Sequence, residues 1–574
     1  MSLPRPPIPG LGFLEDFIPG RGHSNGNGNG NGKTAHSTQT RANGNGRSAA
    51  KRRYDAIVIG SGFGGGAAAC RMAEAGLDVA VLERGRRWER TDFPESIEDA
   101  PALAWHPQAN PRGLYDLRWF EDGVVLTAAG VGGGSLLYAN VQLPAKKEVF
   151  ESGWPEDITL DELLPWYAKS EEALNPVTTP KPYPAKVKAF TGTGKQFGDR
   201  TSELTPIAVH FGEPRIHPLS GRPQEGCDNL GRCLTGCPLH AKNTVDISYI
   251  ARAENLGTDV YPLHEVVSLE PPARKGGLWR VHYRDLQYDE HGVFEAKTVV
   301  VSAGTLGSAR LLLQSKAALL PKLSPALGTK FSGNGNALGA IFDPKARGTT
   351  DAAVDVGPSI TSVIDLWEER GFILEDLGLP PSYMVLLEAL RGVDQIGAGA
   401  RARLRAKEVA ARVGAPDRPT SPDDLSVKRS RVAAPDIEDV LTFLFIGKEN
   451  PAGRVKLSRR GQIDIDFDPS DSQLLYDRME ETLEEVAEAV GGDPVFNLQH
   501  GPLGKYIIAH PLGGVPMADD PAEGVVDSFG RVYGYDGLHV LDGSIVPSPL
   551  GANPSKTIAA LAERGAAQLI ADRS

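Results

Sequence analysis

Short runs of consecutive apolar residues alternate with helical patterns near the start of the chain. Residues 56–59 and 79–82 are apolar and rich in β-branched side chains, which is typical of strands buried on both faces of a parallel sheet. Between them, apolar positions recur at a helical spacing, and the helical pattern ends at Gly76. The segment 54–83 is therefore predicted to form a β-α-β unit.

Three glycines stand between the first strand and the helix of this unit. Gly60, Gly62 and Gly65 form the pattern G-x-G-x-x-G, and Glu83 ends the second strand. Glycine permits a tight turn and a close approach of the backbone to a pyrophosphate, which the start of a helix favours. A carboxylate at the end of the second strand can accept hydrogen bonds from a ribose hydroxyl group. The unit predicts a dinucleotide site without choosing between FAD and NAD, and a glycine-rich loop without a ligand is the alternative.

Further apolar runs predict strands and helices along the rest of the chain. Strands are predicted at residues 259–267, 278–283, 298–302, 443–446, 454–457, 462–467 and 538–541, and helices at 243–256 and 476–490, after 302 and from about 554. The run at 298–302 ends in Ala-Gly-Thr and leads into a helix, which fits a return of the chain to the first sheet.

Composition limits the class of protein. The chain has 574 residues, of which 40% are hydrophobic and 23% charged, and its formal net charge is −12. This length suits two or three domains or one elaborated unit, and the negative charge disfavours general binding of nucleic acids or anionic membranes. No apolar run reaches the roughly 18 residues of a membrane-spanning helix, and the N-terminus lacks the pattern of a secretory signal. We therefore expect a cytoplasmic protein.

Two polar segments are expected to lie outside the packed core. Residues 1–50 contain Asn-Gly repeats and are predicted to form a disordered tail, although the apolar side chains within 4–17 could dock on a surface. The Arg-rich residues 398–430 predict a solvated helix face, with a membrane-surface helix as the alternative.

Further candidate functional residues lie in a second glycine-rich segment and near the C-terminus. Gly130 and Gly132–Gly134 precede Ser135, which predicts either a loop along a flat ligand or a tight turn capped by Ser135. A predicted strand ends in Asp542, and Asn553 is expected to cap the following helix. Singly, these residues have ordinary interpretations as turn formers and caps, and His510 as a core histidine.

Together the motifs resemble a known family. Glu-Arg-Gly at 83–85, GVGGGSLLYAN at 130–140, HPLGG at 510–514, GRVYGY at 530–535 and GANP at 551–554 are similar in order and spacing to the GMC (glucose-methanol-choline) family of FAD oxidoreductases, most of all to its cholesterol-oxidase-like branch. The resemblance covers about residues 54–570 and is weak between about 318 and 440.

The resemblance implies an α/β fold (α+β overall), in which a Rossmann-like FAD-binding domain joins a second, antiparallel-sheet substrate domain. The implied boundaries are a tail at 1–50, FAD-binding parts at 51–145, 226–317 and 496–574, a substrate-domain or connecting segment at 146–225, and a substrate-binding domain at 318–495.

The resemblance also implies the site residues. The catalytic pair would be His510 and Asn553. The FAD-binding residues would be Gly60, Gly62, Gly65, Glu83, Gly133, Gly134, Ser135, Asn140, Val266, Asp542, Gly543, Pro554 and Thr557. In this assignment Asp542 binds a ribityl hydroxyl, Asn140 is chosen over Tyr138, and the start of the last helix faces the flavin's pyrimidine edge.

The implied reaction is oxidation of an alcohol to a carbonyl by hydride transfer to flavin N5. The alcohol oxygen would lie between His510 and Asn553, and a histidine that titrates near neutral pH could share the hydroxyl proton. A 3β-hydroxysteroid with O₂ as acceptor is favoured, with transient membrane contact possible. A dehydrogenase for a non-steroid alcohol, with a quinone or other acceptor, and a non-catalytic flavin-binding protein are the alternatives. Glu375 and Glu388 could shift a steroid double bond, although surface positions are the simpler interpretation.

Three cysteines crowd a short segment. Cys227, Cys233 and Cys237 could hold a metal or an iron–sulfur cluster, with His240 as a fourth ligand. This segment resembles a cysteine-rich stretch of many GMC relatives, but Leu230 stands at the position of its second cysteine. A structural loop of reduced thiols without metal is therefore favoured. Covalent flavin attachment stays open, and the candidate residues are His106, His210 and His217.

Overall fold

The computed structural model describes residues 52–93, 103–121, 123–193, 197, 202–342, 344–345, 357–379, 440–496 and 506–573. The predicted disordered tail, Glu388 and the Arg-rich residues 398–430 lie outside the described residues. Residues from Tyr54 onward cluster into one unit, and the finer domain boundaries stay predictions.

The first sheet contains the predicted β-α-β unit. Its strands follow the order β8-β2-β1-β11-β10-β9, and β20 pairs with β11. They are β1 (Arg53–Ile59), β2 (Val79–Leu82), β8 (Asp259–Tyr261), β9 (His264–Glu270), β10 (Trp279–Asp285), β11 (Glu290–Val301) and β20 (Leu538–Val540). β2 is parallel to both of its neighbours, β1 and β8, and β20 is parallel to β11. β10 is antiparallel to both of its neighbours, β9 and β11. Segments from both ends of the chain therefore build one Rossmann-like sheet, as predicted.

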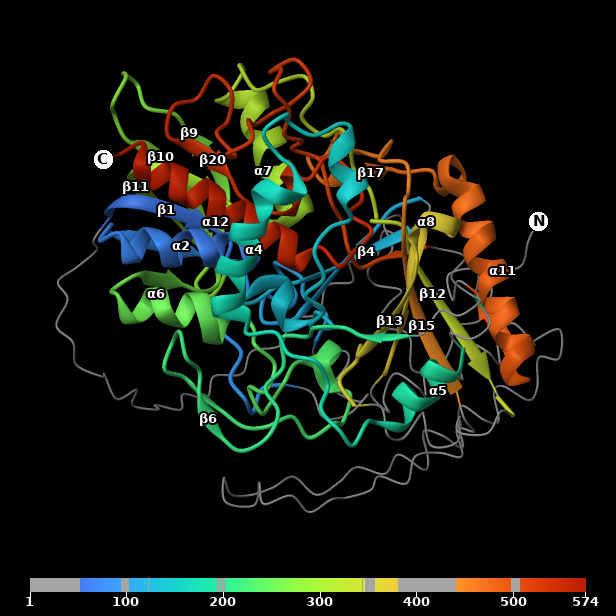
Figure 1. Ribbon diagram of the computed structural model, residues 1–574. Coiled ribbons are helices and arrows are strands. Elements are labelled where there is room, and N and C mark those ends of the chain that lie inside the picture. The colour runs from blue at the N-terminus through green and yellow to red at the C-terminus, as the bar shows by residue number, and fades with distance from the viewer. Residues whose placement is uncertain are drawn as a thin grey trace, which may run out of the picture. The chain divides into compact units, whose positions relative to one another are not determined.

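Helices cover both faces of this sheet, which explains its continuous apolar runs. α2 (Phe63–Glu74) and α12 (Ser555–Ala571) pack on the face of β1 that carries Ala56 and Val58. The two helices contact each other, and Figure 1 shows them beside β1. α7 (Gly304–Ala318) packs on the opposite face. The start of α12 is thereby fixed relative to the glycine-rich turn before α2.

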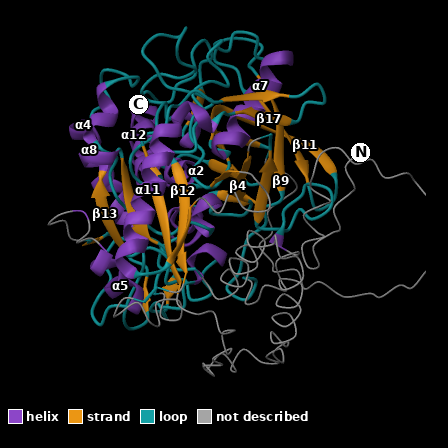
Figure 2. Ribbon diagram, turned by 90° about the vertical axis from the view of Figure 1, so that its right-hand side faces the viewer, coloured by secondary structure: helices purple, strands orange, loops and turns teal. Residues whose placement is uncertain are grey.

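The second sheet is antiparallel throughout, as predicted. Its order is β18-β12-β15-β14-β13-β5, and each pair of neighbouring strands in it is antiparallel. The strands are β5 (Glu203–Leu204), β12 (Asn336–Phe342), β13 (Ser362–Leu366), β14 (Phe372–Asp376), β15 (Val440–Gly447) and β18 (Asp493–Phe496). α11 (Gln473–Val490) and α5 (Ala185–Thr193) cover one face, and Figure 2 shows α11 along β12. The other face packs on Val141 and Ile207, which come from segments outside this sheet.

Smaller elements connect the two sheets. β3 (Tyr115–Trp119), β4 (Gly123–Ala128) and β19 (Tyr506–Ile508) form a three-stranded sheet, and β16 (Arg454–Leu457) with β17 (Ile463–Asp466) and β6 (Arg215–Ile216) with β7 (Pro223–Gln224) form two-stranded pairs. The other helices among the described residues are α4 (Leu160–Leu174), α6 (Ala251–Asn255) and α8 (Trp367–Arg370). The same residues form 3₁₀ segments at Gly133–Leu136, Lys147–Glu151, Arg232–Thr235, Pro469–Ser472 and Gly543–Ile545, and a π-helical turn at Asp246–Ile250.

Two predicted elements differ from the structure. The single strand predicted at 259–267 is wrong, because the chain turns at Leu263, which has a φ of +59°. β8 therefore pairs with β2, whereas β9 pairs with β10. The helix predicted at 243–256 starts later, at Asp246, and its first turn is π-helical.

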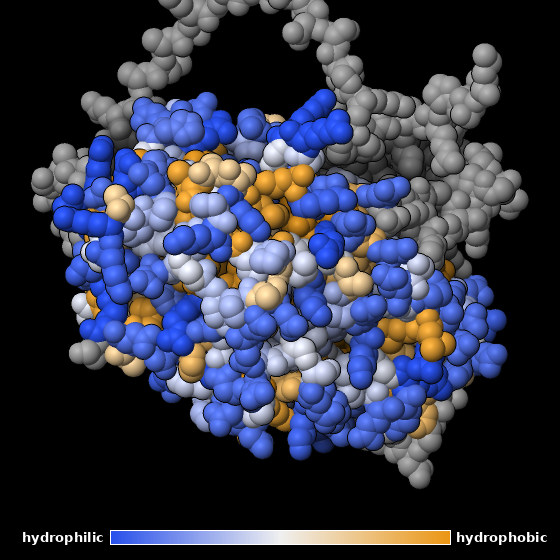
Figure 3. Space-filling view, turned by 90° about the horizontal axis from the view of Figure 1, so that it is seen from above, coloured by the Kyte–Doolittle hydropathy of each residue, from blue (hydrophilic) through white to orange (hydrophobic). Residues whose placement is uncertain are grey.

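The surface drawn in Figure 3 is largely polar, with apolar areas separated by charged and polar side chains. Within the described ranges, no helix is both long enough and apolar enough to cross a membrane.

Candidate active site

The first glycine-rich turn is tightly packed between strands and helix. Gly60 has a φ of +95°, and a Cβ atom there would lie 2.2 Å from the carbonyl oxygen of Ser302. A Cβ atom at Gly65 would lie 2.1 Å from the carbonyl oxygen of Gly60. α2 begins after Gly62 with no side-chain cap, so its first N–H groups are left for an anion.

Ser61 links Glu83 to the second glycine-rich loop. One carboxylate oxygen of Glu83 accepts hydrogen bonds from the Ser61 backbone N–H at 3.1 Å and the Ser61 hydroxyl at 2.7 Å. The other accepts from the Gly85 N–H at 2.9 Å. The Gly132 N–H donates to the Ser61 hydroxyl at 3.0 Å. Burial raises the pKa of Glu83. The first glycine-rich turn, Glu83 and the second glycine-rich loop therefore meet at one place.

The second loop lies against the first. A Cβ atom at Gly133 would lie 2.6 Å from Cα of Gly62, whereas one at Gly134 would meet nothing within 4 Å. Gly134 is exposed, so the space over this residue is open to a ligand. The Ser135 hydroxyl donates to the Gly132 carbonyl at 2.7 Å and accepts from the Val245 N–H at 2.9 Å. The hydroxyl of Ser135 therefore holds the loop in shape.

The start of β9 lies beside the tip of β2. The His264 N–H donates to the carbonyl oxygen of Glu83 at 2.9 Å, and Val266 follows in the same strand, half-buried. This position fits the predicted contact of Val266 with the adenosine half of a dinucleotide.

Asp542 joins three elements at the end of β20. One carboxylate oxygen accepts hydrogen bonds from the Gly304 N–H at 2.9 Å and the Ser308 hydroxyl at 2.5 Å, both in α7. The other accepts from the Ser544 N–H at 2.9 Å. The carbonyl of Gly543 accepts from the Gly513 N–H at 3.1 Å. Protein donors thus engage both carboxylate oxygens, and the HPLGG segment is tied to the same corner.

His510 follows β19, and one of its ring nitrogens is buried. The next residue, Pro511, accepts a hydrogen bond from the Thr305 hydroxyl at 2.7 Å. Nδ1 of His510 is buried and has no hydrogen-bond partner among the described residues. Burial lowers its pKa to about 4, so the expected titration near neutral pH is wrong. The imidazole is neutral at physiological pH.

Asn553 does not cap α12 as predicted. Pro554 occupies the N-cap position, and no side chain caps the helix. Instead the Asn553 amide donates to a carboxyl oxygen of Glu375 at 3.2 Å, while its own Oδ1 is buried without a described partner. Thr557 in the first turn pairs with the Tyr167 hydroxyl at 3.0 Å, so its hydroxyl is used in packing α12 on α4.

Glu375 is fully buried, and the expected surface position is wrong. It lies in β14, where its neighbours in the adjacent strands are Val363 and Leu444. Burial raises its pKa to about 8, against the Asn553 hydrogen bond, which lowers it. Its second oxygen has no described partner. Sequence could not reveal this position, because the strand reads FILED without a motif, although the apolar residues before the acid are a weak signal.

Asn140 is directed to the cysteine-rich loop. Its amide donates to Sγ of Cys233 at 3.1 Å, and its Oδ1 is buried without a described partner. The four cysteines of the chain are free thiols, and Cys227, Cys233 and Cys237 line one small pocket. In the part of the chain that the structure describes, no three His, Cys, Asp or Glu residues are arranged to hold a metal ion.

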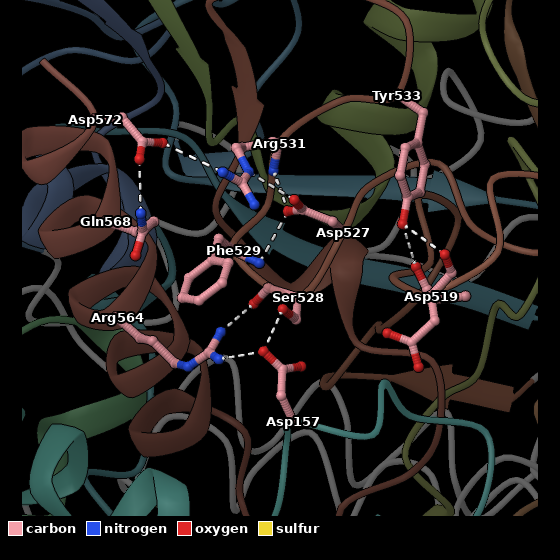
Figure 4. Close-up of polar contacts among 11 residues, drawn as sticks. Asp157, Asp519, Asp527, Ser528, Phe529, Arg531, Tyr533, Arg564, Gln568 and Asp572 are labelled. Carbon is pink, nitrogen blue, oxygen red and sulfur yellow. Dashed lines mark hydrogen bonds and ion pairs between the residues drawn. The ribbon is translucent and has the colours of Figure 1, made fainter.

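Residues just before the GRVYGY segment anchor the C-terminal half of α12. Arg564 donates to the carbonyl oxygen of Ser528 at 2.7 Å and to Asp157 at 2.6 Å, and lies 3.8 Å over the Phe529 ring. Figure 4 shows these contacts beside the ion pair of Arg531 with Asp527. α12 is therefore held in its C-terminal half, away from Asn553.

Comparison with known proteins gives one family. GMC oxidoreductase family profiles match residues 43–331 and 449–562. A cholesterol oxidase of Mycobacterium tuberculosis (strain ATCC 25618 / H37Rv) is 31% identical over 90% of this chain and 91% of its own. A cholesterol oxidase of Acinetobacter baumannii is 28% identical over 89% and 93%. The 6'''-hydroxyparomomycin C oxidase of Streptomyces lividus is 26% identical over 92% and 93%.

A solved structure has the same fold. A fungal aryl-alcohol oxidase has a TM-score of 0.57 and 17% identity over 91% of this chain and 100% of its own.

The uncapped start of α2, the buried Glu83 and the open space over Gly134 fit the FAD that members of this family bind. The chain belongs to the GMC oxidoreductase family and is an FAD-dependent oxidoreductase acting on alcohol donors.

Proposed function

We propose that this protein oxidises the 3β-hydroxyl group of a sterol to a ketone with O₂ as the electron acceptor, and that it also shifts the steroid double bond from Δ5 to Δ4. The observation that carries the proposal is the hydrogen bond between Asn553 and the buried carboxyl group of Glu375. It brings an alcohol-binding candidate and a proton-transfer candidate together.

The surroundings of Glu375 support an apolar substrate. Residues directly opposite in neighbouring strands share one face of a sheet, so Val363 and Leu444 lie on the face that carries Glu375. Ile373 and Ile446 extend the same apolar cluster. A steroid has one hydroxyl group to place and a large apolar skeleton to bury. An aminoglycoside would leave many polar groups without partners against such a face.

His510 and Asn553 would bind the alcohol oxygen. Because the imidazole is neutral, an unprotonated ring nitrogen can accept the hydroxyl proton as the alcohol is oxidised. The Asn553 side chain, held by Glu375 at 3.2 Å, would orient the same oxygen. Bound FAD supplies the acceptor for the hydride of the carbinol carbon. The other expected FAD contacts, from Gly60 to Thr557, are part of the proposal.

Glu375 would move the proton that the double-bond shift requires. Its carboxylate removes a proton from C4 of the Δ5-3-ketone, and the electron pair of that C–H bond forms the C4–C5 double bond. The C5–C6 double bond breaks, and its electron pair takes the same proton back from the carboxyl group at C6. A pKa of about 8 lies near the operating pH, where a group exchanges protons most effectively in both directions.

Anaerobic stopped-flow mixing of the holoprotein with cholesterol and a panel of other alcohols tests the substrate. Rapid bleaching of the flavin by the sterol, followed by H₂O₂ formation in air, is the expected result. Bleaching by a different alcohol would replace the sterol, and reoxidation only by a quinone would indicate a dehydrogenase. No bleaching by any alcohol would contradict the catalytic proposal. Vesicle sedimentation and cell fractionation would test the predicted membrane contact and cytoplasmic location.

A further inference from the structure

A single asparagine amide spans the residues that precede Asn553. The Asn334 amide nitrogen donates to the carbonyl oxygen of Ala552 at 2.9 Å, and its oxygen accepts from the Leu550 N–H at 2.8 Å. The two bonds bracket Gly551, and Asn334 is completely buried. The backbone next to Asn553 is therefore fixed by a side chain more than two hundred residues away.

A buried carboxyl group holds the segment that carries this amide. One oxygen of Glu449 accepts hydrogen bonds from both the Gly333 and the Gly335 N–H, each at 2.8 Å. The Tyr476 hydroxyl donates to its other oxygen at 3.3 Å. Glu449 is 3% exposed. The N–H groups on both sides of Asn334 thus depend on one acceptor, so the backbone there cannot shift without losing them.

The same segment also holds the loop after His510. The N–H and carbonyl groups of Ser332 exchange hydrogen bonds with those of Leu512 at 3.1 and 3.0 Å. Residues 332–335 therefore lie between the loops of His510 and Asn553.

We propose that Asn334 and Glu449 are positioning residues, which set the place of the Asn553 side chain relative to Glu375 and His510. This inference rests on the proposed function, because it assigns a purpose to the placement of these three side chains. An error of about 1 Å in such a placement reduces rates by about 100-fold, and the two bonds around Gly551 prevent it.

The first test is N334G. Asn334 has a φ of +61°, which glycine adopts without steric cost, so the substitution removes the amide and leaves the backbone conformation accessible. The expected result is a fall of about 10- to 100-fold in the anaerobic rate of flavin reduction at saturating alcohol, with substrate binding little changed. A crystal structure of the variant should show Asn553 displaced from its 3.2 Å contact with Glu375.

The second test compares E449Q with E449A. Glutamine keeps an oxygen that accepts from both glycine N–H groups, whereas alanine leaves both buried without a partner. The rate of flavin reduction in E449Q should stay within about threefold of the wild-type rate, whereas the rate in E449A should fall as much as in N334G. If N334G does not fold, this pair still decides the question. N255A is the matched control, because the Asn255 amide also donates to a backbone carbonyl, that of Ser220 at 2.7 Å, and its rate should be unchanged.

A wild-type rate in N334G with Asn553 in place would overturn the proposal, as would equal losses in E449Q and E449A. The proposed sterol substrate is tested separately. If another alcohol reduces the flavin, the same variants are measured with that alcohol. If no alcohol reduces the flavin, the proposed catalytic roles are contradicted. The crystal structure of N334G still shows whether Asn334 sets the position of Asn553.

Discussion

The amide of Asn553 donates a hydrogen bond to the buried carboxyl group of Glu375 at 3.2 Å. This contact joins the start of α12, which packs on the first sheet, to the centre of the second sheet. Each partner keeps one buried oxygen without a described hydrogen bond. The unused oxygens mark where a substrate or water can supply the missing hydrogen bonds.

We predict that E375Q separates two reactions. The amide cannot take up a proton from C4, so formation of the conjugated ketone should fall by about 10²–10⁴-fold, while oxidation to the Δ5-ketone continues. Product analysis by chromatography distinguishes the two ketones. E368Q, which changes an exposed carboxylate in α8, should behave as wild type. Unchanged isomerisation in E375Q would remove Glu375 from this role.

The pH dependence of stability should also report on Glu375. Its pKa in the folded protein is raised from 4.5 to about 8 by burial, so the folded state holds a proton that the unfolded state has lost. Stability therefore falls as the pH rises from about 4.5 to about 8. In E375Q this decline should be smaller, and thermal unfolding across that range measures it. Equal slopes in both proteins would show that the carboxyl group has an ordinary pKa.

H510A should lower turnover by about 10²–10⁴-fold if the imidazole accepts the hydroxyl proton. Because burial lowers the pKa of His510 to about 4, no activity transition near pH 6.5 should arise from this residue in the wild type. Steady-state rates across pH test both statements. H291A alters an exposed histidine and serves as the control; near-normal turnover in H510A would exclude the proposed role.

G133A should weaken FAD binding. The added Cβ atom would lie 2.6 Å from Cα of Gly62 at a φ of +54°, so the two glycine-rich loops must separate. We expect the purified variant to lose its yellow colour on dialysis, and fluorescence titration gives the dissociation constant. G192A, where a Cβ atom meets nothing within 4 Å, should keep its flavin. Tight FAD binding by G133A would show that the loops can adjust.

R564A should lower stability without changing the chemistry of the folded enzyme. Arg564 is 6% exposed and loses two hydrogen bonds, which predicts a loss of about 1–3 kcal/mol. Arg531 lies nearby in Figure 4, but its side chain is 45% exposed, so R531A should cost less than about 1 kcal/mol. Urea denaturation compares the two. Equal losses of stability in R564A and R531A would show that the burial of Arg564 adds nothing to its contribution.

Sequence predicts local features of this fold well and long-range contacts poorly. The glycine turn, β2 and the helix before Gly76 follow from neighbouring residues, and so were found. Glu375 is a candidate from sequence, but its burial is not predicted, because that burial depends on neighbouring strands and on a partner almost two hundred residues away. Asn553 looked like a helix cap because Asn often is one, but Pro554 takes that position.

The alternation of side chains in the second sheet has an evolutionary consequence. Ile373 lies on the face of β14 that carries Glu375, whereas Phe372 and Leu374 pack under α11. Under the proposed function, substitutions on the first face would change which alcohol is accepted, while the second face would keep the sheet attached to its helices.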